Sequence, residues 1–141
     1  MAILLTAAAG GLIALQAPIN SVLGKSTGSL AAALVSFGIG TMALAIIVVL
    51  SGQVGGVSGA ADVAPIYLIG GLLGAVYVTC ALIAVPSIGA GGVAAGTITG
   101  QLIASVALDR VGAFGLDQAP LTADRIAGVA LLLAGTFLIV R

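Results

Sequence analysis

Charged side chains are scarce in this sequence of 141 residues. Lys, Arg, Asp and Glu together make up 6% of the chain, whereas 61% of it is apolar, and the mean hydropathy is +1.36. A soluble globular domain carries about a quarter charged residues, so this chain has too little polar surface to dissolve alone. The composition therefore predicts a membrane protein and excludes water as its main solvent.

Histidine is absent, and cysteine occurs once, as Cys80. A zinc site built from protein ligands needs several His or Cys residues, and a disulfide within the chain needs two cysteines. A nucleophile activated by His cannot be built either. We therefore expect no metal, no cofactor and no enzymatic activity. The formal net charge is zero and the four basic residues form no cluster, which excludes nucleic-acid binding.

The eight charged residues separate apolar stretches that are long enough to cross a membrane. A helix needs about 20 apolar residues to cross the hydrocarbon core. The uncharged stretch from Tyr67 to Leu108 is about twice that length, so we expect a reversal near Pro86. The first stretch lacks a basic leader, and we interpret it as a retained helix rather than a cleaved signal peptide. The prediction is one all-α membrane domain, residues 1–141, with five transmembrane helices at about 2–23, 30–50, 66–85, 88–108 and 126–140.

The basic residues do not indicate one orientation in the membrane. With five spans, the N-terminus, Arg110 and Arg125 lie on one side, and Lys25 and Arg141 lie on the other. Because orientation follows the balance of Lys and Arg, two against two gives no preference. Either the N-terminal amine or a partner decides the orientation, or the chain inserts both ways.

Glycine is abundant, with 22 residues, many of them inside the predicted spans. Small residues let transmembrane helices approach closely. Several glycines recur at spacings of four or seven residues, which keep them on one helix face: Gly70 and Gly74; Gly92, Gly96 and Gly100; Gly128 and Gly135. These stripes predict close helix packing, either within one bundle or, for the last two spans, between chains.

Large polar side chains also lie inside the predicted spans. Gln16 and Asn20 are four residues apart, hence on one helix face, and Pro18 between them is a candidate hinge because proline removes a backbone hydrogen bond. Gln101 lies in the span at 88–108, and Ser36 and Tyr77 lie in the second and third spans. Polar groups at membrane depth are costly and indicate function. We interpret the amides as the lining of a substrate-binding cavity; the alternative is that they only join helices.

No Asp, Glu, Lys, Arg or His side chain lies deep inside a predicted span. Proton-coupled pumps and cation exporters usually depend on such a group. Asp109 is the one candidate for coupling, but it lies near the membrane interface and is adjacent to Arg110, a potential partner. The substrate is therefore not required to be a hard cation.

Several short motifs follow one another along nearly the whole chain. They are Gln16-Ala17-Pro18-Ile19-Asn20, Leu23-Gly24, Ser36-Phe37, Gly40-Thr41, Gly70-Gly71-Leu72-Leu73-Gly74-Ala75, Tyr77, Pro86, Gly89, Gly100-Gln101, Asp109-Arg110, Gly112, Arg125 and Gly128. In this order and spacing the set resembles the YdcZ-like family, a five-helix branch of the drug/metabolite transporter superfamily. One departure is that the chain has no Trp, which many relatives carry before the third span.

The resemblance implies a transporter of the plasma or inner membrane. Larger members of the superfamily join two five-helix halves in inverted orientation, and small members assemble as antiparallel dimers with the substrate between the halves. This chain would then be one half of an inverted-repeat fold, which requires an inverted copy of itself or an inverted homologue. The expected function is secondary transport of a small polar or amphipathic metabolite or drug. A passive dual-topology channel and a non-transporting accessory subunit are the alternatives.

Overall fold

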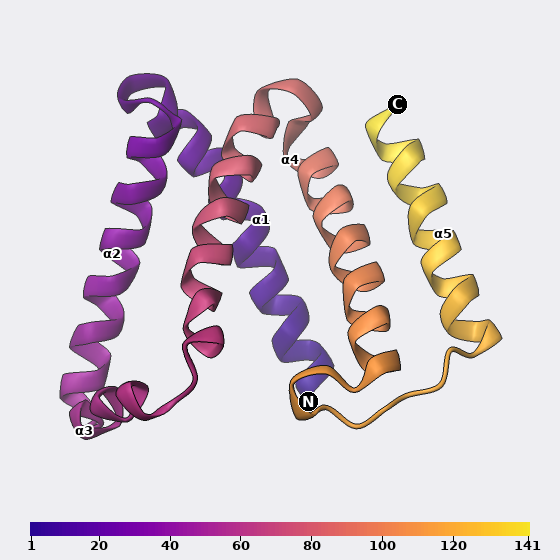
Figure 1. The fold of residues 1–141 in the computed structure, drawn as a ribbon. Helices are drawn as coiled ribbons and strands as arrows, with labels where there is room; N and C mark the ends of the chain where they lie inside the picture. The colour runs from indigo at the N-terminus through magenta and orange to yellow at the C-terminus, as the bar shows by residue number, and fades with distance from the viewer. The chain divides into compact units, whose positions relative to one another are not determined.

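A computed structural model describes residues 1–141, and all of its regular elements are helices (Figure 1). Its α-helices are α1 (Ala2–Thr27), α2 (Ser29–Leu50), α3 (Val54–Ser58), α4 (Gly70–Val111) and α5 (Ala123–Val140), and three short 3-10 helices lie at Gly59–Asp62, Pro65–Ile69 and Ala113–Gly115. The helices α1, α2, α4 and α5 are long and apolar enough to cross a membrane. The predicted all-α membrane class is confirmed.

The longest helix, α4, is interrupted once. Its 42 residues are helical except at Gly89, where φ is 71° and ψ is 168°. This positive φ is a conformation that glycine adopts without steric cost. The interruption leaves helical segments at 70–88 and 90–111, each about 20 residues long and therefore sufficient for one crossing. With α1, α2 and α5, these two segments make five potential crossings.

The interruption lies at Gly89, three residues beyond Pro86, near which a reversal was expected. The helix continues through Pro86 as far as Ile88. Proline removes one backbone hydrogen bond, and a transmembrane helix tolerates that loss because neighbouring groups satisfy the freed carbonyl. Gly89 is the first glycine after the proline, and it adopts the positive φ that interrupts the helix.

The ends of the other helices also differ from the expected spans. Helix α1 continues to Thr27, so Lys25 lies in its last turn. Helix α5 begins at Ala123 because the side chain of Thr122 accepts a hydrogen bond from the backbone N–H of Arg125 at 3.4 Å. Arg125 therefore belongs to the first turn of α5 rather than to the preceding loop.

Two compact units make up the chain, and each is described by itself. One consists of Leu15–Pro86, and the other of Met1–Ala14 with Ser87–Arg141. The Leu15–Pro86 unit contains the end of α1, all of α2 and the start of α4. The Ser87–Arg141 unit contains the rest of α4 and all of α5, together with the start of α1. The boundary at Pro86 lies close to the interruption in α4.

Small side chains form the core of the Leu15–Pro86 unit. The buried cluster is Ala32, Ala33, Val78 and Leu82, with Leu23, Phe37 and Tyr77 packed against it. Gly24 of α1 lies close to both neighbouring helices: a Cβ atom there would be 3.6 Å from Leu82 Cδ1 and 3.7 Å from the Cβ of Ala32. Gly74 of α4 packs against the ring of Phe37: a Cβ atom on Gly74 would lie 3.3 Å from Cζ of that ring. Small residues thus permit close helix approach in this unit.

Only part of the glycine stripes lies at helix contacts within the chain. In the Ser87–Arg141 unit, a Cβ on Gly92 would lie 3.1 Å from the Cβ of Ile88 and 3.4 Å from Val140 Cγ2 on α5. The remaining stripe positions have no atom within 4 Å of such a Cβ: Gly70, Gly96, Gly100, Gly128 and Gly135. Packing between chains therefore stays a prediction for these five.

Candidate functional site

Asn20 is the most deeply buried polar residue of α1. Its side chain is 4% exposed, and its Nδ2 atom is fully buried without a hydrogen-bond partner. The neighbouring Ala17 and Ser21, on the same face of the helix, are also buried. A buried amide without a partner costs about 1–3 kcal/mol, so such a group is uncommon unless another molecule satisfies it.

The helix contacts in the Leu15–Pro86 unit place Asn20 at a defined level. Gly24, one turn after Asn20, packs between Ala32 and Leu82. Helices α1 and α2 are joined by a short turn at Gly28 and run in opposite directions (Figure 1). Moving one turn from Gly24 toward the start of α1, to Asn20, therefore matches moving one turn from Ala32 toward the end of α2. That step leads from Ala32 to Ser36. Asn20 and Ser36 therefore lie at the same level of the unit.

Tyr77 belongs to the same level on α4. Its side chain packs against the core cluster. Along α4, Tyr77 lies between Gly74, which contacts Phe37, and Leu82, which lies next to Gly24. Both Ser36 and Tyr77 are half-buried, whereas Gln16, one turn before Asn20 on α1, is exposed. The Leu15–Pro86 unit thus brings three of the predicted binding residues to one level, with Gln16 one turn away. Pro18 is half-buried within the continuous helix α1.

Gln101 and Asp109 lie in the other unit, on the 90–111 segment of α4. Gln101 is exposed, and the neighbouring Gly100 has open space beside it. Asp109 is half-buried and forms an ion pair with Arg125, whose Nη1 lies 3.3 Å from Asp109 Oδ2. Arg110, the potential partner considered from the sequence, does not form this pair, because adjacent residues on a helix do not face each other. The backbone carbonyl of Asp109 also accepts a hydrogen bond from the N–H of Ala119 at 2.9 Å.

A hydroxyl pair that the sequence patterns did not predict joins α4 to α5. Thr99 Oγ1 and Thr136 Oγ1 are 2.6 Å apart, and both lie near the carbonyl oxygen of Ala95, at 2.9 and 3.1 Å respectively. Thr99 is 6% exposed. The one signal in the sequence is a threonine inside each of the last two spans, which does not reveal that their hydroxyls meet.

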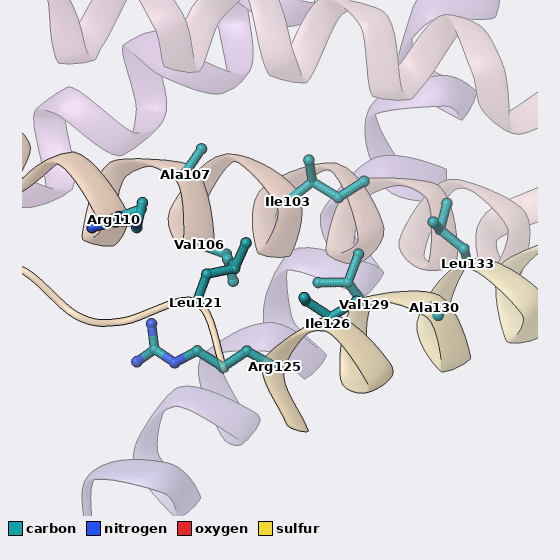
Figure 2. A pocket seen from close by; sticks show the side chains of 10 residues that line it. All are labelled: Ile103, Val106, Ala107, Arg110, Leu121, Arg125, Ile126, Val129, Ala130 and Leu133. Atoms are coloured by element: carbon teal, nitrogen blue, oxygen red, sulfur yellow. The ribbon is translucent and has the colours of Figure 1, made fainter. Parts of the chain in front are cut away.

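An apolar groove lies between the 90–111 segment of α4 and the first half of α5 (Figure 2). Its volume is about 430 Å³, and its lining residues are Ile103, Val106, Ala107, Arg110, Leu121, Arg125, Ile126, Val129, Ala130 and Leu133. Figure 2 shows the two arginines toward one end of the groove and Leu133 toward the other. No motif in the sequence predicted this groove.

Comparison with protein families gives one match, which covers residues 1–138. The family is a branch of the drug/metabolite transporters and is described as "Putative inner membrane exporter, YdcZ". The chain belongs to this family. The resemblance seen in the motifs is confirmed, and the protein is a multi-pass inner-membrane protein of a transporter family, not of an enzyme family. Comparisons with curated proteins and with solved structures find no match.

Proposed function

We propose that this chain exports a small polar or amphipathic metabolite or drug by alternating access, as an antiparallel dimer. Membership of an inner-membrane exporter family supports transport. The buried Nδ2 of Asn20 is the observation that carries the site assignment, because it is a hydrogen-bond donor at membrane depth that nothing in the chain satisfies. A carbonyl, hydroxyl or phosphoryl oxygen of a substrate is the acceptor it lacks.

The proposed site extends from Asn20 to neighbouring polar groups. Ser36 and Tyr77 lie at the same level of the Leu15–Pro86 unit, and Gln16 is one turn away along α1. Gln101 lies in the other unit and stays a predicted binding residue from the sequence alone. These groups donate and accept hydrogen bonds without carrying charge, which favours a neutral or weakly charged substrate over a hard cation.

The odd number of predicted crossings and the even balance of basic residues support an antiparallel dimer. A chain with five crossings is half of an inverted repeat, and two inverted copies place a site near the bilayer midplane. The glycines without neighbours on the 90–111 segment of α4, Gly96 and Gly100, give a surface that a second chain can approach closely. Pro18 would serve as the hinge of α1, since it removes one backbone hydrogen bond.

Asp109 is the proposed coupling group of this exporter. Its carboxylate holds Arg125 at the start of α5, so loss of its charge would release that contact between α4 and α5. Coupling through Asp109 would therefore change how α5 is attached to α4 without a charge deep in the membrane.

Export can be tested before the substrate is identified. Cells that produce the chain are compared with cells that do not, and the small molecules in the medium are profiled by mass spectrometry. We expect at least one compound to accumulate outside, and Asn20→Leu to abolish its accumulation while the protein still inserts. Thr79→Ala is the matched control, because the Thr79 hydroxyl bonds only to the carbonyl of Ala75 in its own helix, at 2.8 Å.

Three results would contradict the proposal. Undiminished export by Asn20→Leu, or by Gln16→Ala and Gln101→Ala, would remove the site assignment. In proteoliposomes loaded with the exported compound, flux without exchange of labelled for unlabelled compound would indicate a channel. No flux, with purification in a fixed complex with an unrelated protein, would indicate an accessory subunit.

A further inference from the structure

The groove between α4 and α5 has a chemistry different from that of the proposed export site. None of the residues proposed to bind the exported substrate lines it. Eight of its ten lining residues are apolar, and the two that carry charge are both arginines, Arg110 and Arg125 (Figure 2). The groove itself is therefore apolar, and the two arginines lie toward one end of it.

Both arginines have hydrogen-bond donors available at this end. A guanidinium has five N–H donors, and Arg125 has one side-chain contact, to Asp109 at 3.3 Å. Arg110 is exposed and makes no ion pair. Asp109 orients Arg125 but does not line the groove, nor do Asp117 and Asp124, the other two carboxylates of this region. Planar guanidinium groups bind phosphate oxygens in pairs of hydrogen bonds.

The charged end of the groove coincides with helix ends. Arg110 lies in the last turn of α4, and Arg125 lies in the first turn of α5. In a membrane-spanning helix the charged ends lie at the headgroup level, and the apolar turns beyond them lie in the hydrocarbon. The groove from Ile126 to Leu133 therefore extends about 10 Å into the hydrocarbon, at 1.5 Å per helical residue.

We propose that this groove binds an anionic phospholipid. The phosphate lies between Arg110 and Arg125, and one acyl chain lies along the apolar side chains of α4 and α5. Charge complementarity selects this occupant, since a zwitterionic lipid brings a cation that opposes the arginines. A soluble anion would leave the apolar length of the groove unused. The site contains none of the residues proposed to bind the exported substrate.

The test measures lipid binding to the full chain directly. The purified protein in mild detergent is titrated with phosphatidylglycerol or with phosphatidylcholine of the same acyl chains, and bound lipid is counted by native mass spectrometry. We expect tighter binding of phosphatidylglycerol. Arg110→Gln should weaken that binding about fivefold, the ratio that about 1 kcal/mol per basic residue gives. Arg141→Gln removes a basic residue outside the groove and should leave binding unchanged.

A second variant tests the acyl-chain part of the groove. Ala107→Phe fills it without altering charge, and we expect it to lower phosphatidylglycerol binding at least as much as Arg110→Gln. If circular dichroism shows that Ala107→Phe loses helix, Ala130→Phe on the opposite wall of the groove is measured in its place. Inorganic phosphate at millimolar concentration should compete weakly, because it lacks the chain.

Four results would overturn the proposal. They are equal affinity for the two lipids, equal losses in Arg110→Gln and Arg141→Gln, full lipid binding by a folded groove-filling variant, and complete displacement of lipid by inorganic phosphate. The second of these would indicate only a general attraction of anions to a basic residue. The last two would indicate a headgroup site without an acyl-chain site.

Discussion

The two threonines that join α4 to α5 should contribute unequally to the free energy of unfolding. Two hydroxyl protons serve three short contacts among Thr99, Thr136 and the carbonyl oxygen of Ala95. Each hydroxyl donates one proton, so at most two of the contacts are full hydrogen bonds at once. Valine in place of threonine keeps the side-chain shape and removes the hydroxyl.

The two single substitutions should differ in cost. Thr136→Val removes every hydrogen bond between the helices at this level, whereas Thr99→Val leaves Thr136 able to donate to Ala95 at 3.1 Å. Hydrogen bonds between transmembrane helices contribute about 0.6 kcal/mol on average and up to about 1.7. We expect Thr136→Val to lower the free energy of unfolding by an amount in that range, and Thr99→Val by less than half as much.

Unfolding by dodecyl sulfate in mixed micelles, followed by circular dichroism, measures these differences. Thr79→Val is the control, since Thr79 bonds to Ala75 within its own helix, and it should change the free energy of unfolding by less than either effect. The double variant should cost less than the sum of the singles, because the pair shares one network. The reasoning would be refuted if Thr99→Val lowered the free energy of unfolding more than Thr136→Val does. It would also be refuted if Thr99→Val, Thr136→Val and the control Thr79→Val had the same effect.

Two further predictions use the same assay. Gly92→Ala should lower the free energy of unfolding by about 1–3 kcal/mol, because the added Cβ atom would meet Ile88 and α5. Gly96→Ala is the control: its Cβ atom would meet no other atom within 4 Å, so this change should be neutral or slightly stabilising. Equal effects of the two substitutions would contradict this prediction. Asp109→Asn should lower the free energy of unfolding by less than about 1 kcal/mol at low ionic strength, because both side chains of the ion pair with Arg125 are over a third exposed. In 1 M salt the substitution should have no effect, since salt screens exposed charges. A loss that does not depend on salt would contradict this prediction.

The membrane class and the presence of long apolar helices were predictable from the sequence. Both depend on the scarcity of charge, a property of long segments that neighbouring helices do not alter. The interruption in α4 was less predictable, because both Pro86 and Gly89 disfavour a straight helix. Their effects differ physically: the proline loses one hydrogen bond and remains helical, whereas the glycine adopts a positive φ.

The site was predictable as a set of residue types but not as an arrangement. The spacing of Gln16 and Asn20 predicts a shared face on α1, but it does not predict that Asn20 is buried and Gln16 exposed. That difference depends on how α1 packs in the folded chain, which the spacing of two residues does not give. The ion pair of Asp109 with Arg125 joins residues far apart in the sequence, so it required the packing of α5 against α4.

Topology tests the central claim, the antiparallel dimer, most directly. A reporter active only in the cytoplasm and one active only outside it are each fused after Arg141 in separate copies of the chain. The even balance of basic residues predicts activity from both fusions at comparable levels, because copies insert in both orientations. Activity from one fusion alone would contradict an exporter formed by two copies of this chain.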